Sequence, residues 1–547
     1  MKKLNLGIHA LAGVCLSAVL MSILYLANQL AGLPFLPFDL FDWITRVLPG
    51  SVITFGIDTM IDIMRLLGVN VADTAKTAEQ VIANLQYLVA AVAAVIVFYG
   101  VLKARKIRAD TLSGIIMAAI FGLPQIVISI AIGQSTVYPV LKILWLGFLF
   151  LVWGWAVSWS YLRIGHLEPE DWVDNEENYK VERLDRRKFL IHLGIVSATI
   201  TVVGSGIGSL INQVKKRNRD QALENTMAHR TETGKSMPFP NNNDPVMPAP
   251  GTRPEYTPIK DHYKVFIRTE PTVINGSTWV LPITGMVDNP LMLTLDDIKN
   301  RYESFDQYVT LSCISGRIGT SLIGTTQWTG VHLQDVMKDV IVRPGARYLH
   351  ISSGDGFYET VNLDLIAKDN RIMLCYAWDG HDLPVDHGYP LRIWIPDRYG
   401  MKQPKWITSI EVSDTYKKGY WVERNWDKTA RIKTTSVIDT IAVNAVFKDG
   451  NKRFIPIGGI AFAGARGISR VELRVDGGPW EQAKLRAPLS ETTWVIWRYD
   501  WLFSEGEHTF EVRCAEANGT PQIEEKHANR PSGATGIHKI KKDIPDV

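Results

Sequence analysis

Cysteine is scarce in this sequence of 547 residues. There are four cysteines, Cys15, Cys313, Cys375 and Cys514, and no two of them form a Cys-x-x-Cys pair. The spacing therefore favours neither a disulfide framework nor a structural zinc site. The sequence also lacks Cys-x-x-Cys-His, which excludes covalently attached c-type haem. Each cysteine needs its own explanation.

The sequence also has no large excess of positive or negative charge. The formal net charge is only +3, so nothing indicates a nucleic-acid partner. The length exceeds that of one ordinary domain. Nearly all long apolar runs fall within residues 1–212, whereas the rest reads as a soluble protein rich in Trp, Tyr, Gly and Pro. We therefore predict a multidomain chain with a transmembrane helical region at 1–212.

Five apolar runs are long enough to cross a membrane. They lie at about 8–31, 80–103, 112–133, 136–162 and 189–212. If all five cross, the basic stretches at the N-terminus, at 103–108 ("KARKIR") and at 183–188 ("RLDRRK") share one side, which is the cytoplasmic side by the positive-inside rule. We expect a multi-pass protein of the cell membrane whose residues after 212 are extracytoplasmic.

Segment 51–68 differs from these runs. Asp58, Asp62 and Arg65 are spaced to share one helical face, away from most of the apolar residues. This pattern predicts an amphipathic helix lying in the membrane interface. The alternative is a sixth span with a charged face, which would place "KARKIR" outside.

The start of the last apolar run, "DRRKFL", resembles a twin-arginine export signal. Arg186, Arg187, Phe189 and Leu190 match that pattern, while Asp185 and Ile191 depart from it. Two arginines before a span also satisfy the positive-inside rule alone. His9 and His192 are the histidines at span ends, and we predict no haem between them. The membrane half is interpreted as an anchor that also binds a partner.

The soluble half divides by composition. Residues 213–258 are polar and broken by prolines, which predicts an extended linker. Residues 259–430 alternate strand-like runs with a few helical turns, with Thr294 as the N-cap before "LDDI", and predict an α+β domain. Residues 431–547 hold closely spaced strand patterns typical of a β-sandwich.

Several ordered motifs carry a family resemblance. "LSCISGRIGTSLIGTTQWTGVHLQDVM", "HGYPLRIWIP" and "YGMKQPKW" resemble the sulfite oxidase superfamily of molybdopterin-dependent oxidoreductases. "GMVDNPLMLTLDDI" is similar to its bacterial membrane-anchored members. The resemblance covers about residues 262–540 and leaves out the membrane half. It implies a molybdopterin domain followed by an Ig-like sandwich of the dimerisation type, and hence a homodimer.

The resemblance gives Cys313 a role. In the family, a single cysteine after a "T-L-x-C" strand ligates molybdenum, and the pterin supplies two more sulfurs. A thiolate is a soft donor that suits such a metal. Cys375 and Cys514 follow core patterns, and Cys15 lies within an apolar run. The implied cofactor is mononuclear molybdenum–molybdopterin.

The pterin is anionic and polar, so its pocket needs arginine forks, lysine charge and backbone amides. The resemblance implies that Arg268 stands at the pocket mouth and Asp355 contacts the pterin. Asp355, between two glycines, also fits a simple turn. The residues implied to grip the cofactor and its phosphate are His387, Arg392, Gln403, Pro404 and Lys405.

The sequence departs from sulfite oxidases after the cysteine. Gly316 replaces an asparagine and Ile318 replaces the second arginine, which leaves Arg317 as the anion contact. Trp426 aligns with the family's tyrosine beside the metal, and Lys539 aligns with its C-terminal arginine. Cys313, Arg317 and Trp426 form the predicted catalytic set.

The predicted reaction is two-electron oxygen-atom transfer on a small substrate at molybdenum. No second redox centre is visible in the sequence, so a separate partner, a cytochrome or quinone, exchanges the electrons. A reductase of sulfoxides or N-oxides is the alternative enzyme. A metal-free membrane scaffold or transporter-associated domain is the alternative from another class.

Overall fold

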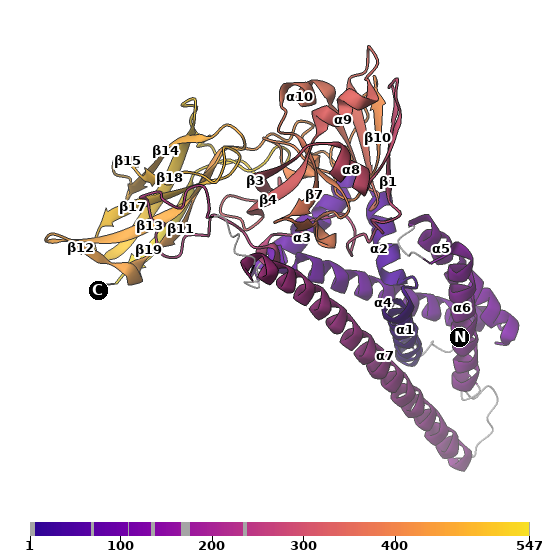
Figure 1. Ribbon diagram of the computed structural model, residues 1–547. Coiled ribbons are helices and arrows are strands. Elements are labelled where there is room, and N and C mark those ends of the chain that lie inside the picture. Colours follow the sequence, from indigo (N-terminus) through magenta and orange to yellow (C-terminus); the bar gives the residue numbers. More distant parts are fainter. Residues whose placement is uncertain are drawn as a thin grey trace. The chain divides into compact units, whose positions relative to one another are not determined.

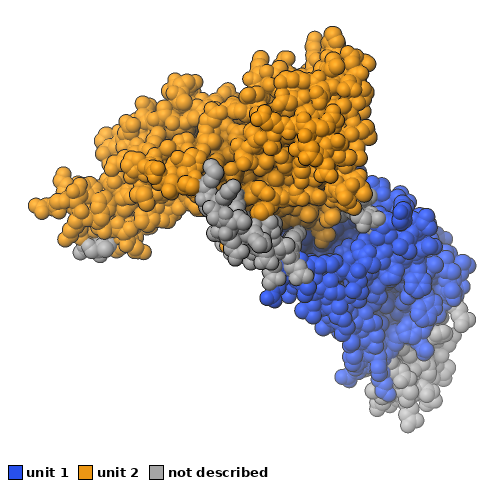
Figure 2. Space-filling model, in the orientation of Figure 1, with its two compact units in different colours: residues 1–48, 74–234 blue, residues 49–73, 235–547 orange. Residues whose placement is uncertain are grey.

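The computed structural model describes residues 6–66, 71–107, 109–132, 137–165, 176–232 and 238–545. The chain divides into two compact units (Figure 2). Residues 1–48 and 74–234 form the first unit, and residues 49–73 and 235–547 form the second.

The first unit is helical. Its helices are α1 (Leu6–Ala31), α2 (Leu36–Val47), α4 (Val71–Arg105), α5 (Thr111–Ile132), α6 (Pro139–Gly165) and α7 (Glu176–Glu232). Five stretches of helix are, by length and composition, able to cross a membrane: Gly7–Ala31, Lys76–Arg105, Thr111–Ile132, Pro139–Ile164 and Arg187–Lys215. Each overlaps one of the five predicted apolar runs.

Small residues let these helices approach closely. A Cβ built on Gly154 would lie 2.3 Å from the carbonyl oxygen of Gly114, so α5 and α6 meet almost backbone to backbone. His9 packs with its ring centroid 5.3 Å from that of Tyr99. The ring of His192 hydrogen-bonds the carbonyl of Lys188 on its own helix at 2.7 Å.

Helix α7 corrects the expected linker in its first part (Figure 1). We expected extended chain from residue 213, but α7 continues to Glu232. The reason is local, because residues 209–233 contain neither glycine nor proline and are rich in helix formers. The side chain of Arg186, the first of the twin arginines, lies outside the described residues.

The second unit begins, in chain order, with helix α3 (Gly50–Leu66), which coincides with the segment expected at the membrane interface. The following α+β domain holds β1 (Val280–Gly285), β2 (Leu291–Thr294), α8 (Leu295–Arg301), β3 (Ser304–Ser312), β4 (Ile323–His332), α9 (Leu333–Val340), β5 (Tyr348–Ser353), β6 (Tyr358–Asn362), α10 (Leu363–Lys368), β7 (Met373–Trp378), β8 (His381–Asp382), β9 (Arg392–Trp394) and β10 (Ile407–Ser413). Three short 3-10 turns, η1 (Ile259–Asp261), η2 (Val385–His387) and η3 (Gly400–Lys402), connect them.

Two sheets organise this domain. One has the order β2-β1-β10-β5-β6, and the other has the order β3-β4-β7-β8 with β9 paired to β7. All pairings are antiparallel except β1 with β10. Thr294 caps α8 as predicted, since its hydroxyl accepts from the Asp297 N–H at 3.1 Å.

The C-terminal part forms two further antiparallel sheets. Its strands are β11 (Thr435–Ile441), β12 (Phe447–Asp449), β13 (Lys452–Phe462), β14 (Ile468–Val475), β15 (Glu481–Gln482), β16 (Lys484–Leu485), β17 (Val495–Leu502), β18 (Gly506–Glu516) and β19 (His538–Ile544), with the 3-10 turn η4 (Val443–Ala445). The orders are β11-β13-β17-β16, with β12 on β13, and β15-β14-β18-β19. Ile457 and Trp497 from one sheet share a buried core with Val471 and Phe510 from the other, as expected of two packed sheets.

Residues 238–258 are docked rather than loose. Arg486, which precedes β17, donates to the carbonyl oxygens of Asn241 and Val246, each at 3.0 Å, and to the Glu255 carboxylate at 2.6 Å. Arg253 pairs with Asp439 on β11 at 2.6 Å. The second part of the expected linker is therefore fixed to the C-terminal sheets.

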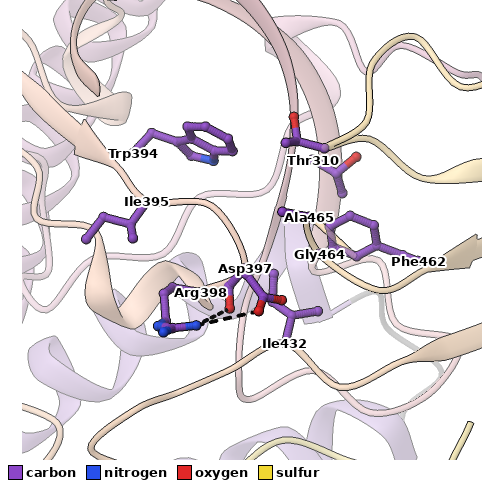
Figure 3. A pocket seen from close by; sticks show the side chains of 10 residues that line it. Thr310, Trp394, Ile395, Asp397, Arg398, Ile432, Phe462, Gly464 and Ala465 are labelled. Carbon is purple, nitrogen blue, oxygen red and sulfur yellow. Dashed lines mark hydrogen bonds and ion pairs between the residues drawn. The ribbon is translucent and has the colours of Figure 1, made fainter. Parts of the chain in front are cut away.

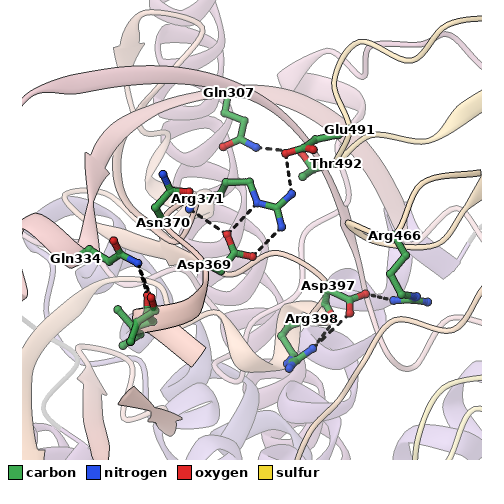
Figure 4. Close-up of polar contacts among 12 residues, drawn as sticks. Gln307, Gln334, Asp369, Asn370, Arg371, Asp397, Arg398, Arg466, Glu491 and Thr492 are labelled. Carbon is green, nitrogen blue, oxygen red and sulfur yellow. Dashed lines mark hydrogen bonds and ion pairs between the residues drawn. The ribbon is translucent and has the colours of Figure 1, made fainter. Parts of the chain in front are cut away.

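Charged side chains join the α+β domain to the C-terminal sheets (Figure 4). Arg371 pairs with Asp369 in its own domain at 2.8 Å and with Glu491 across the junction at 2.7 Å. Asp397, after β9, receives Arg466 from the C-terminal sheets. These contacts hold the Cys313-bearing domain against its neighbour.

Candidate cofactor and metal site

Cys313 stands directly after strand β3. Its N–H donates to the Leu322 carbonyl at 3.0 Å, and its own carbonyl accepts from the Gly316 N–H at 3.1 Å. This turn explains the glycine found in place of the family's asparagine, because a Cβ at 316 would lie 2.7 Å from Thr320 Cγ2. Cys313 is thus held at the end of a strand by a tight loop.

Cys313 is half-buried as a residue, whereas Cys375 and Cys514 are buried. Cys313 Sγ lies 3.0 Å from Ser315 Oγ. Desolvation raises the pKa of the Cys313 thiol, and the Ser315 contacts and the positive Lys405 act in the opposite direction. Of the three cysteines in the second unit, Cys313 is the one placed to bind an external group.

His387 and Arg392 form a buried polar pair. Arg392 donates from Nη1 to the His387 carbonyl at 3.0 Å, and its guanidinium lies 4.3 Å from the Trp328 ring centroid. Among the described residues, His387 Nε2 and Arg392 Nε have no hydrogen-bond partner. A buried polar atom left unpaired costs about 1–3 kcal/mol. The fold therefore leaves these two buried nitrogens available to hydrogen-bond a bound group.

Burial also sets the ionisation of this pair. It lowers the pKa of Arg392 to about 10, which leaves the guanidinium charged near neutral pH. It lowers the pKa of His387 well below its usual value, and the charges of His262 and Lys405 act in the same direction. The site thus offers one charged fork and one neutral imidazole.

The Gln403–Lys405 loop lies against this pair. Lys405 Nζ donates to the Asp386 carbonyl at 3.0 Å and lies 4.7 Å from the Trp406 ring centroid. Gly388 has φ +116°, and a Cβ there would sit 3.0 Å from Lys405 Cβ, so only glycine fits without strain. Gln403 donates to the Arg398 carbonyl at 2.8 Å, and Pro404 O accepts from the Ile393 N–H at 3.1 Å.

Arg268 and Asp355 lie together at the far end of the same loop. Arg268 Nε donates to the Asp355 carbonyl at 2.9 Å, and Asp355 Oδ1 accepts from the Phe357 N–H at 2.9 Å. The Gly354 N–H donates to the Trp406 carbonyl at 2.8 Å, which joins this corner to Lys405. The Asp355 carboxylate closes its own turn, which was the alternative drawn from its glycine neighbours.

Three further aromatic residues belong to the site, and two of them, His262 and Tyr263, carried no sequence signal. His262 stacks on Tyr263, with ring centroids 4.9 Å apart, and its edge meets His387 at 5.4 Å. The Tyr263 hydroxyl is buried without a partner among the described residues. Tyr399 is buried too, and desolvation raises its pKa to about 12. His262 and Tyr263 lie outside the quoted motifs and gave no pattern from which to predict them, whereas Tyr399 begins the motif "YGMKQPKW" but was not singled out.

Trp426 belongs to a buried cluster that includes Ile314, the residue after Cys313. The guanidinium of Arg530 lies 4.7 Å from its ring centroid. The neighbouring Asn529 donates to the Ser315 carbonyl at 2.5 Å. A C-terminal arginine therefore approaches the Cys313 loop, although not at the position expected from the sequence.

Lys539 corrects that expectation. It pairs with Glu511 on the neighbouring strand at 3.5 Å and is exposed. His538, one residue earlier, faces the loop, since Nε2 would lie 2.9 Å from a Cβ on Gly319. Successive residues of a strand point to opposite faces, so Lys539 points away from Cys313.

Arg317 lies at the solvent side of the same loop. Its side chain is 56% exposed, and Nη2 lies 3.0 Å from Asp62 Oδ1 of helix α3. The predicted residues thus fall into a largely buried group around Arg392 and Lys405, and a second group on and beside the Cys313 loop, in which Arg317 is exposed and Trp426 is buried.

A narrow pocket lies elsewhere, at the junction with the C-terminal sheets (Figure 3). Asp397 and Arg398 line it together with Trp394, Phe462 and Ala465. None of the residues predicted from the sequence lines it. We assign this pocket to the junction and not to the Cys313 site.

The donor set fits a metal that brings its own ligands. Among the described residues, no group of three His, Cys, Asp or Glu side chains is placed to hold a metal ion. A metal at Cys313 would take its remaining ligands from a cofactor, and soft sulfur donors match a thiolate. The unpaired nitrogens of His387 and Arg392 fit the polar atoms of such an anionic cofactor.

Comparisons with known proteins agree with this fit. Residues 268–421 match the family model described as "Oxidoreductase molybdopterin binding domain". A nitrate reductase [NAD(P)H] of Hordeum vulgare is 25% identical over 347 residues, which are 52% of this chain and 38% of that protein. The sulfite oxidase of Arabidopsis thaliana is 25% identical over 273 residues, 42% of this chain and 69% of that protein.

The matched parts are limited in extent. The chain spans about a third of the length of the nitrate reductases that it matches. The crystal structure of the sulfane dehydrogenase SoxCD from Paracoccus pantotrophus covers 51% of this chain and 81% of its own, at 18% identity and a TM-score of 0.43. A likeness this low carries no argument about function. Residues 268–421 therefore form a molybdopterin-binding oxidoreductase domain, similar to the matched parts of sulfite oxidases and nitrate reductases, and this domain implies a molybdenum–molybdopterin cofactor.

Proposed function

We propose that this chain is a membrane-anchored enzyme that transfers an oxygen atom to or from a small substrate in a two-electron reaction. One observation carries the proposal: the charge of Lys405 acts on both the half-buried Cys313 and His387, and His387 Nε2 and Arg392 Nε are buried with no partner among the described residues. When bound, the molybdenum cofactor supplies the two-electron change and the exchangeable oxygen.

The protein side chains have separate roles in this proposal. Cys313 binds the metal. His387, Arg392 and Lys405 hold the anionic cofactor, and Gln403 with Pro404 shapes the loop that presents Lys405. Arg268 and Asp355 close the far corner of that loop.

On the substrate side, Arg317 orients an anionic or polar substrate, and Trp426 forms part of the wall beside the Cys313 loop. Trp426 donates only an indole N–H, so it does not replace the hydroxyl of a tyrosine. Arg530 adds a second cation near this loop.

The five apolar helices support membrane anchoring, and the basic stretches support an extracytoplasmic catalytic unit. A twin-arginine route suits this placement because it carries folded, cofactor-loaded proteins. Electrons pass to or from a separate cytochrome or quinone. The C-terminal sheets are the proposed homodimer surface.

The direction of the reaction is open to experiment, because the relatives are a sulfite oxidase and nitrate reductases. A sulfoxide or N-oxide reductase is the second enzymatic candidate. The test is to purify the full chain in detergent, measure its molybdenum content, and follow the metal's electron paramagnetic signal with sulfite, nitrate, methionine sulfoxide and an N-oxide. A matched control replaces the buried Cys375 by Ala.

We expect about one molybdenum per chain in the wild type and in Cys375→Ala, and a change of signal with at least one substrate. Protein that folds and is exported without binding molybdenum would identify a metal-free scaffold and refute the proposal.

A further inference from the structure

Helix α3 belongs to the catalytic unit although it lies in sequence between two helices of the other unit. At its N-terminal end, a Cβ on Gly50 would lie 2.9 Å from the Cα of Arg424. Near its C-terminal end, Asp62 Oδ1 lies 3.0 Å from Arg317 Nη2. Twelve residues of helix span about 18 Å. Helix α3 therefore reaches from the segment around Arg424 to the Cys313 loop.

Both of these segments belong to the substrate side of the site. Cys313 and Gly316 close a turn, so their Cα atoms lie within about 7 Å. Arg317 is the next residue, about 3.8 Å further along the chain. At the other end, Trp426 follows Arg424 by two positions and packs in the same cluster as Ile314. The helix contacts the two loops that flank Cys313 and not a remote surface.

The Asp62–Arg317 ion pair is exposed to solvent. The side chains of Arg317 and Asp62 are 56% and 63% exposed. Exposed pairs are weak, and salt screens them. A carboxylate that is held only this loosely is one that another anion can replace. Met64, two positions beyond Asp62, is buried, which keeps this end of the helix in place.

We propose that Asp62 is a specificity-determining residue that occupies Arg317 until an anionic substrate replaces its carboxylate. A neutral substrate leaves the Asp62–Arg317 pair intact and gains nothing from Arg317. The inference rests on the proposed function, since it gives Arg317 its substrate. It adds that helix α3, which lies outside the molybdopterin domain, discriminates between charged and neutral substrates.

The test replaces Asp62 by Asn, which keeps the shape and removes the competing charge. An exposed pair corresponds to a factor of about two to five in binding. We therefore expect KM for an anionic substrate to fall about two- to fivefold and kcat to stay unchanged. KM for a neutral sulfoxide should not change. Asp288→Asn is the matched control, because Asp288 pairs with Arg343 at 2.7 Å with similar exposure, 58% and 53%.

A second measurement does not depend on turnover. Hydrogen–deuterium exchange of residues 50–66 is followed in the full chain with and without sulfate, at constant ionic strength set with chloride. Sulfate should increase exchange at the C-terminal end of α3 in the wild type, and Asp62→Asn should show the increase without sulfate.

Equal exchange in wild type and Asp62→Asn, with KM values equal to those of Asp288→Asn, would overturn the inference. A molybdenum-loaded protein that turns over no oxygen-atom donor or acceptor would instead refute the proposed function. The two failures can be told apart, because the exchange measurement tests the role of Asp62 without turnover.

Discussion

Lys402→Met offers the sharpest test of how the cofactor loop is held. Lys402 directly precedes Gln403, and its Nζ lies 2.5 Å from Glu359 Oε1 and 3.2 Å from the Thr360 carbonyl. Both charged side chains are almost completely buried. Methionine fills most of the volume of the lysine side chain but leaves the Glu359 carboxylate buried with no cation.

The expected cost is large. Removing one partner of a buried ion pair typically costs about 3–5 kcal/mol, because the other charge stays desolvated. A change of 1 kcal/mol shifts Tm by about 2–4 °C in domains of 150–250 residues. We therefore expect the transition of the α+β domain to fall by roughly 6 °C or more at pH 8. Molybdenum content should fall too, because the Gln403–Lys405 loop loses its anchor.

The pH dependence has a definite sign. Desolvation raises the pKa of Glu359, and Lys402 opposes this rise. Without Lys402 the pKa rises further, so folding takes up a proton that the unfolded chain, with a pKa near 4.5, does not hold. Stability of the variant therefore increases as pH falls from 8 towards 5.5, and its deficit relative to the wild type narrows.

Calorimetry of the full chain in detergent at both pH values measures this. Glu359→Gln together with Lys402→Met should recover most of the loss, since the amide oxygen still accepts from the Thr360 N–H. Lys417→Met, which breaks an exposed pair with Glu411, is the control and should change Tm little. A Tm within about 2 °C of the wild type, or a deficit that widens at pH 5.5, would refute the reasoning.

Four further predictions concern the site and the topology. Cys313→Ser should unfold at the wild-type Tm and lose all turnover, and activity near the wild-type value would contradict thiolate ligation. A reporter that is active only in the cytoplasm, fused to the C-terminus, should stay silent, and a strong signal would contradict the extracytoplasmic placement. Changing Arg186 and Arg187 to Lys should trap the catalytic unit inside if export follows the twin-arginine route, and unaffected export would argue against that route. Sulfite should be a poor substrate with kcat/KM below about 10⁶ M⁻¹s⁻¹, because Ile318 removes a guanidinium and Trp426 lacks a hydroxyl; a higher value in steady-state assays would contradict that reading.

Local patterns predicted much of the fold. Runs of apolar residues gave five long helices, because length and hydropathy are local properties. The Thr294 cap and the two C-terminal sheets followed from turn and alternation signals in the same way. Cys313 was separable from Cys375 and Cys514 because only the latter two lie inside apolar strand patterns.

Contacts distant in sequence were not predictable. Asp62 and Arg317 are 255 positions apart, and a charged face on a short helix suits a membrane surface as well as a protein surface. Tyr263 and Arg530 carry no motif, and their closeness to the site depends on how the whole unit folds. The error at Lys539 arose because an alignment gives a position along a strand but not the face to which a side chain points.

The contacts of Arg486 with residues 238–258 affect how mechanical force would be transmitted along this chain. Tension applied from the α7 side would meet the attachments of Asn241, Val246 and Glu255 to Arg486 first. Only after these and the Arg253–Asp439 pair gave way would the pull reach Thr257, whose N–H is bonded to Thr325 on β4 at 2.8 Å. The C-terminal sheets would therefore bear such tension before it reached the strands next to Cys313.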